Sequence, residues 1–215
     1  MKVPIRLLFI SLPVLFMSAQ STSPQEEILE LKKLGKNHII HMALKELHSI
    51  SKPEVTEDDF HFIQILASNK RIKVHFGYNV IYFPKNSSYN TDIIVEFPSK
   101  SISISSDNNK GGNTTFYRPT TEDMNVINFI LNRNGANNNV FNKGNKSSVV
   151  ISIYEKENHY LVYTTSRNPD QGGIEYIEEI HKETGEILST LSGHYDPAPE
   201  TPSLEKEKFI EIDNK

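Results

Sequence analysis

The sequence predicts an α+β fold in which helices pack on antiparallel strands, and three observations support this class. Apolar residues recur at spacings of three and four between residues 23 and 50, which is typical of an amphipathic helix. From residue 60 onward the spacing changes to two, as in strands with one buried face. The same order of helix and then strands returns after a polar stretch at residues 105–115.

The first helix is expected to begin at Ser23 and to run to about Ile50. Glu26 and Glu27 lie in its first turn, where the positive end of the helix dipole favours carboxylates. Gly35 is a point at which this helix could bend or be interrupted. Four strands are expected after it, at residues 60–65, 71–78, 92–97 and 101–105.

A second, shorter helix is expected from residue 119, because residues 119–123 have the composition of a helix N-terminus and Ile127, Ile130 and Leu131 then share one face. A polar loop follows at residues 132–148. Four more strands are expected at residues 149–154, 159–165, 174–181 and 186–191.

This order divides the chain into five segments. They are a leader (1–20), a helix-plus-meander unit (21–105), a linker or long loop (106–118), a second helix-plus-meander unit (119–195) and a proline-containing, charged tail expected to be disordered (196–215). Two tandem α-β-β-β-β units and one continuous larger sheet both account for the pattern.

The leader has the features of a secretory signal peptide. Lys2 and Arg6 precede an apolar run at residues 7–17, and the small residues Ser18 and Ala19 follow. The run is shorter than the roughly 20 apolar residues that a membrane-spanning helix needs. The mature chain is therefore expected to be periplasmic or extracellular, without stable membrane insertion.

The cysteine content and the net charge exclude some kinds of chemistry and disfavour some partners. The chain has no cysteine, so it offers neither disulfides nor thiol nucleophiles, and its stability must come from packing. Loss of Lys2 and Arg6 with the leader would change the formal charge from −4 to −6. A surface with this charge does not favour nucleic acid as a partner.

The histidines and carboxylates are weak evidence for a metal-binding or catalytic site. His38, His41 and His48 are near one face of the first helix, but they lack the spacing of a metalloprotease helix, and the polar edge of an amphipathic helix is the favoured interpretation. Two mixed clusters also occur along the chain. They are Asp58, Asp59 and His61, and Glu175, Glu178, Glu179 and His181.

On a strand, Glu175, Glu179 and His181 would share one face and Glu178 the other, which favours a solvated surface over a catalytic group. The serines stand in no Gly-x-Ser-x-Gly turn, and the glycine-rich stretches lack the lysine of a phosphate loop. The sequence therefore predicts no catalytic residue, no metal ligand and no cofactor. Tyrosines gather on the expected strands, and the candidate interface residues are Tyr160, Tyr163, Tyr176 and His194.

The C-terminal half, roughly residues 119–195, contains an ordered series of segments at residues 159–166, 170–177 and 182–188, followed by His194. Gly172 and Gly173 would let the chain bend as it re-enters the sheet, and Gly185 would close the last hairpin. This series resembles bacterial immunity proteins with a nuclear-transport-factor-like, or cystatin-like, fold. It departs from them in lacking tryptophan and in carrying Thr164 and Thr165 on the first strand.

The first half resembles, at the level of fold, the helix-plus-meander modules of secreted peptidase-inhibitor type. Together the two resemblances imply a cystatin-like helix on a curved antiparallel sheet and a non-catalytic, immunity- or inhibitor-like role, with another exported protein as the partner. Residues 92–97 or 186–191 could pair with that partner as strands. The alternative is a small-ligand-binding or hydrolytic protein that uses the pocket of a cone-shaped sheet.

Overall fold

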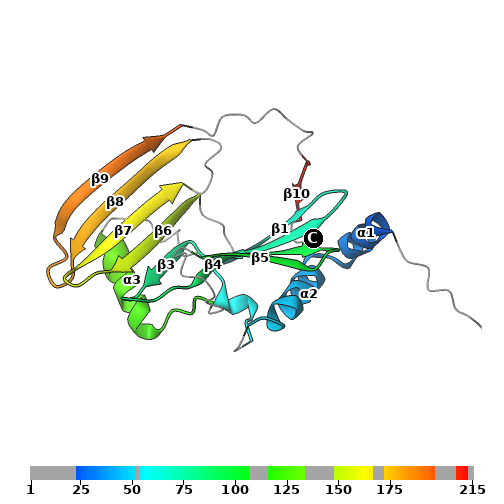
Figure 1. The fold of residues 1–215 in the computed structure, drawn as a ribbon, viewed down its shortest axis with the longest axis horizontal. Coiled ribbons are helices and arrows are strands. Elements are labelled where there is room, and N and C mark those ends of the chain that lie inside the picture. Colours follow the sequence, from blue (N-terminus) through cyan, green and yellow to red (C-terminus); the bar gives the residue numbers. More distant parts are fainter. Residues whose placement is uncertain are drawn as a thin grey trace, which may run out of the picture.

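The computed structural model describes residues 23–51, 54–106, 116–133, 148–166, 172–196 and 207–212. These residues form three α-helices, one 3₁₀-helix and two five-stranded sheets, which confirms the α+β class (Figure 1). The expected signal peptide lies outside the described residues. Within the described ranges, no helix is long and apolar enough to cross a membrane.

The first sheet has the strand order β10-β1-β2-β4-β5, and each neighbouring pair is antiparallel. Helices α1 and α2 pack on the same face of it through their buried apolar side chains. The bounds are α1 Pro24–Leu34, α2 Lys36–His48, the 3₁₀-helix Glu57–Asp59, β1 Phe62–Ala67, β2 Ile72–Gly77, β4 Asn90–Phe97, β5 Ser101–Ser106 and β10 Ile210–Glu211.

The start of α1 and the break between α1 and α2 follow from local sequence preferences. Ser23 and Glu26 form a reciprocal capping box that satisfies two backbone N–H groups at the start of α1. The single helix expected up to residue 50 is two helices, because Gly35 separates α1 from α2 with a φ of +82°. A side chain would strain this left-handed conformation, whereas glycine adopts it at no steric cost.

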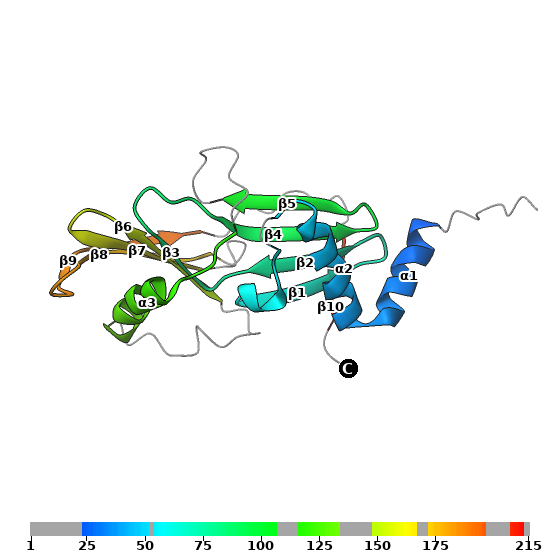
Figure 2. The same cartoon turned by 90° about the horizontal axis from the view of Figure 1, so that it is seen from below.

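The second sheet has the order β3-β6-β7-β8-β9, and α3 covers one of its faces. Seen from below, α2 lies across the first sheet and α3 across the second (Figure 2). A helix on a sheet thus occurs twice, which fits the cystatin-like arrangement expected from sequence. The bounds are α3 Thr121–Arg133, β3 Val80–Phe83, β6 Val149–Glu155, β7 His159–Ser166, β8 Gly173–His181 and β9 Ile187–Tyr195.

Strand β3 joins the two halves. It follows β2 along the chain but pairs in parallel with β6 of the second sheet. All four of its residues are buried: Ile81 and Phe83 enter the core under α1 and α2, while Val80 and Tyr82 enter the core under α3. The segment at residues 21–105 therefore contributes one strand, β3, to the sheet whose other strands come from residues 119–195.

The C-terminal segment also departs from expectation. Residues 196–215 were expected to be disordered, yet Ile210 and Glu211 pair with β1 of the first sheet, opposite Ala67 and Leu66. The prediction is wrong for this stretch because the pairing depends on an edge about 140 residues away in the sequence, which local composition cannot reveal.

Tyr117 reinforces the connection between the sheets. Its ring is 1% exposed and packs edge-on against Tyr78 at 5.1 Å, and its backbone oxygen accepts a hydrogen bond of 2.9 Å from the Tyr78 hydroxyl. Its own hydroxyl oxygen accepts the backbone N–H of Tyr82 on β3 at 3.0 Å. Burial raises the pKa of the Tyr117 phenol, so the group stays neutral and serves as a structural hydrogen-bonding group.

The Tyr117→Phe substitution should destabilise the whole protein. It removes the acceptor for the Tyr82 N–H and leaves a buried donor unsatisfied, which costs about 1–3 kcal/mol. Chemical denaturation of the variant measures this loss. The matched control is Tyr176→Phe, because Tyr176 is 43% exposed and the same change should stay within about 0.5 kcal/mol. Equal effects of the two substitutions would contradict the role given to Tyr117.

Candidate functional site

The two sheets present four edges, which differ in how far they are covered. The β1 edge is covered by β10, and the β3 edge is buried along its whole length. Strands β5 and β9 have no strand partner on their outer side among the residues described. Strand β4, at residues 90–97, lies between β2 and β5, so residues 92–97 are interior and cannot accept a partner strand.

Strand β9 is the longer and more apolar of the two open edges, and it forms the outer margin of the molecule (Figure 1). Ile187, Leu188 and Leu191 are 43%, 50% and 65% exposed. The nine residues of β9 include no lysine, arginine, aspartate, glutamate or proline, the residues that commonly protect an edge strand from pairing. Strand β5 is six residues long and exposes one large apolar side chain, Ile104 at 40%.

Small residues on β9 lie opposite glutamates on β8. Glu175 faces Gly193 and Glu179 faces Ser189, and both glutamates are on the sheet face that α3 does not cover. A Cβ placed on Gly193 would meet no atom within 4 Å, so the side chain of Glu175 is not covered at this position. The apolar pair of Ile177 and Leu191 lies between the two acidic positions.

The four candidate interface residues do not form one patch. Tyr160 is buried between α3 and Tyr82, with its ring 6.3 Å from that of Tyr82, so it belongs to the core and not to a surface. Tyr163 is half-buried on the opposite face of the sheet. Tyr176 and His194 are exposed on the face that Tyr160 shares, on β8 and β9. Tyr176 is 43% exposed because α3 does not cover this part of the face.

A polar cluster fixes the end of the second sheet where β9 begins. The Lys182 ammonium donates a 2.7 Å hydrogen bond to Glu155, and the Lys182 backbone N–H donates to the Asn158 carbonyl at 3.2 Å. The hydrogen bond from Lys182 lowers the pKa of the Glu155 carboxyl, which remains ionised at neutral pH. These contacts tie the β8–β9 turn to the β6–β7 turn and so hold the start of β9 in place.

The glycines named from sequence have separate roles. Gly172 has a φ of +71° immediately before β8, and Gly173 is the first residue of that strand. Gly185 has a φ of +68° in the β8–β9 turn, which packs against the end of α3. A Cβ at this position would lie 2.9 Å from the ring of Phe129 and would also contact the Arg133 guanidinium.

The mixed cluster that contains Asp59 and His61 holds the backbone in place. Asp59 accepts the Thr56 N–H at 2.7 Å and pairs with the Arg118 guanidinium at 2.9 Å, while the Nδ1 atom of His61 accepts the Asn79 N–H at 3.0 Å. These polar atoms are thus engaged in structural hydrogen bonds.

A hydrolytic site in the hollow of a curved sheet would need polar groups such as His75, Tyr163 and Asp123 in one enclosed place, and these three residues lie apart. His75 on β2 interacts with Asp92 on β4 in the first sheet, whereas Tyr163 is on β7 of the second sheet. Asp123 caps α3 by accepting the Thr120 N–H at 2.7 Å. The enclosed site that the hydrolytic alternative requires is therefore not formed by these three residues.

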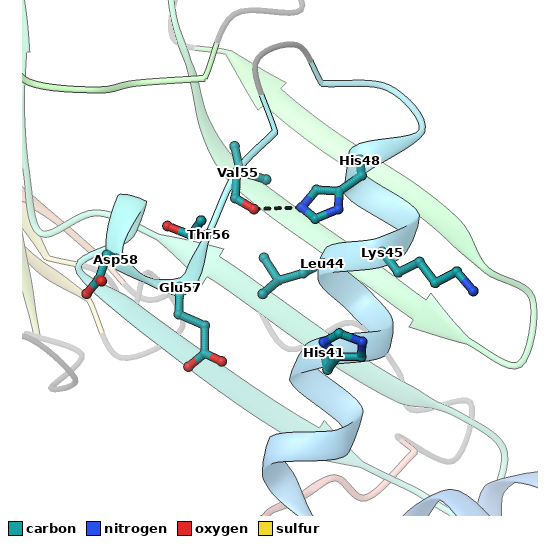
Figure 3. Close-up of a pocket in the computed structure, with 8 residues that line it drawn as sticks. All are labelled: His41, Leu44, Lys45, His48, Val55, Thr56, Glu57 and Asp58. Atoms are coloured by element: carbon teal, nitrogen blue, oxygen red, sulfur yellow. Dashed lines mark hydrogen bonds between the residues drawn. The ribbon is translucent and has the colours of Figure 1, made fainter.

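One pocket of about 550 Å³ opens between α2 and the segment that leads to the 3₁₀-helix. His48 bridges the two walls, since its Nε2 atom is 2.7 Å from the Val55 carbonyl oxygen and donates a hydrogen bond to it (Figure 3). Two of the lining residues, His41 and His48, belong to the histidines that lie near one face of the helix in the sequence. The lining consists of His41, Leu44, Lys45, His48, Val55, Thr56, Glu57 and Asp58.

The pocket offers basic groups on one wall and carboxylates on the other, which suits a small ligand carrying both charges. Its polar side chains are at the surface, and the hydroxyl of Thr56 donates to Asp59 at 3.1 Å and is not poised as a nucleophile. No group of three or more metal-ligating side chains occurs among the described residues.

Comparison with known proteins gives no relative for this chain. It matches no protein-family model, no curated protein and no solved structure.

The Gly185→Ala substitution should destabilise the turn that begins β9. Alanine in this left-handed conformation costs about 1–2 kcal/mol, and the added Cβ would also push against Phe129. Thermal and chemical denaturation measure the loss. Gly193→Ala is the control, because its Cβ would enter open space within a strand and should leave stability unchanged or slightly raised. A neutral Gly185→Ala variant would contradict this role of the turn.

Proposed function

We propose that this chain is an exported, non-catalytic protein-binding module of immunity or inhibitor type, which binds its partner by adding a partner strand to the edge of β9. The observation that carries the proposal is the nine-residue β9 edge, which lacks protecting charges and exposes Ile187, Leu188 and Leu191. An edge with these properties is a template for pairing with another chain.

The side chains around β9 indicate the chemistry of the partner strand. A partner strand would lie beside β9 and would contact Leu191 on the face without α3. On either side of Leu191 are the small residues Gly193 and Ser189, which do not cover the glutamates opposite them on β8, Glu175 and Glu179. Lysine or arginine side chains of the partner strand could reach across these small residues to the carboxylates. A segment of the form basic–x–apolar–x–basic therefore complements this edge in both charge and alternation.

The decisive test uses variants of β9. The mature protein, from about residue 20, is first used to capture a partner from the exported proteins of its source. The Ile187→Lys/Leu191→Lys double variant should then bind that partner at least tenfold more weakly, because it removes two exposed apolar anchors, and Leu191→Lys also places a positive charge between the basic side chains of the partner strand. The matched control is Leu29→Lys on α1, which is 55% exposed and should retain wild-type affinity.

Hydrogen exchange of the complex shows where the partner binds. The backbone amides of β9 should become protected, and the affinity should fall as salt concentration rises. Inhibition of the partner's activity on mixing would establish the immunity or inhibitor role. Unchanged exchange in β9, together with full binding by the double variant, would overturn the proposal.

The second candidate function is binding of a small ligand, and the pocket between α2 and the 3₁₀-helix is the observation that favours it. A small-molecule screen that raises the unfolding temperature of the wild-type chain, with loss of the effect in Lys45→Ala, would support this alternative. A stoichiometric protein partner that protects β9 would instead support the strand-pairing function.

A further inference from the structure

The edge of β1 is covered by a short segment of the same chain. Ile210 and Glu211 of β10 pair with Ala67 and Leu66, and the Ile212 N–H donates a 3.0 Å hydrogen bond to the Ile65 carbonyl oxygen. The backbone pairing is thus limited to a few residues. Ile210 remains 74% exposed, so most of the recognition comes from other side chains.

The acidic side chain of Glu207 is held in a site that the turn between β1 and β2 provides. The Arg71 guanidinium donates to the Glu207 carboxylate at 2.8 Å through Nε and pairs with it at 2.7 Å through Nη2, and the Ser68 hydroxyl donates to the other oxygen. Glu96 on β4 lies 3.2 Å from Arg71 on its other side and positions the guanidinium within the sheet.

Phe209 and Glu211 complete the recognition. The Phe209 ring lies beneath two cations, with the Lys73 ammonium 5.1 Å and the Arg71 guanidinium carbon 5.7 Å from its centre. Glu211 accepts a 2.9 Å hydrogen bond from the Gln64 amide. The covering segment therefore reads acidic–x–aromatic–x–acidic, and each of these three side chains meets a complementary group on the first sheet.

These contacts have the form of a peptide bound to a strand edge. The receptor groups belong to β1, β2 and the turn between them, whereas the bound segment contributes few backbone hydrogen bonds and a partly exposed ion pair, which is weaker than a buried one. We infer that the β1 edge is a second strand-binding site, separate from β9, for an extended partner segment of the form acidic–x–aromatic–x–acidic. Residues 207–212 occupy this site within the same chain and are displaced by the partner segment.

Competition within one chain sets the expected size of the effect. A tethered segment acts at an effective concentration on the order of mM, so a separate peptide with an intrinsic Kd of about 0.1 mM would bind the covered edge roughly tenfold more weakly than the open edge. Release of the tail should therefore raise the affinity for an added peptide by about ten times.

The test uses the full-length chain and a fluorescent peptide with the sequence of residues 205–215 as the probe. The Glu207→Lys/Phe209→Ala variant should release its own tail, shown by faster hydrogen exchange in β1, and bind the peptide about tenfold more tightly than the wild type does. Adding Arg71→Glu to this variant should abolish binding, whereas adding Lys156→Glu, an exposed change in the turn between β6 and β7, should leave it intact. A peptide in which the Phe is replaced by Ala should bind more weakly.

Two results would overturn the inference. One is a variant that is folded, as judged by circular dichroism, with an open β1 but that does not bind the peptide. The other is a concentration-dependent dimer of the wild-type chain that disappears with Glu207→Lys/Phe209→Ala, because the occupant of the edge would then be the tail of a second copy. If the double variant does not fold, the wild-type chain and its Arg71→Glu variant are compared instead at mM concentrations of the peptide. Binding at the edge predicts that the peptide slows hydrogen exchange in β1 of the wild type and not in the Arg71→Glu variant, and equal exchange in the two would overturn the inference.

Discussion

The architecture depends on the burial of β3 between two cores. Its four side chains alternate between the core under α1 and α2 and the core under α3, and each contributes about 1.5–3 kcal/mol when fully buried. The parallel pairing with β6 places the second sheet relative to the first, and the Tyr117 hydroxyl fixes the strand at Tyr82. The position of β9 at the outer margin follows from this junction, because β6, β7 and β8 are built outward from β3 in order.

Local patterns were sufficient to predict most elements. Alternation placed the strands from β6 to β9 within a few residues, and the residues before α3 predicted its start, where Thr120 and Asp123 form reciprocal hydrogen bonds. Strand β3 was missed because Val80–Phe83 is apolar on both faces and shows no alternation. Strand β10 was missed because a short charged segment gains its order from Arg71, Lys73 and Ser68 far away in the sequence.

The candidate site was only partly predictable for the same reason. From the sequence, residues 92–97 and 186–191 are equally suited to pair with a partner strand. Only the sheet order distinguishes them, since β4 is interior and β9 is an edge. Tyr160 and Tyr176 show that propensity alone does not separate core from surface. Tyr160 is buried under α3. Tyr176 is on the same face of the sheet, on the neighbouring strand, but the helix does not cover it. The shared feature of β9 and β1 is an edge suited to an added strand, open in one case and covered by residues 207–212 in the other.

Native-state hydrogen exchange at increasing denaturant tests most directly whether β3 unites the two sheets. If burial on both faces of β3 couples the cores, the slowest amides of β2 and of β7 will exchange through a single opening with the same free energy and the same denaturant dependence. A lower opening free energy for β6–β9, with β1, β2 and β4 still protected, would contradict this claim and show that the second sheet unfolds independently.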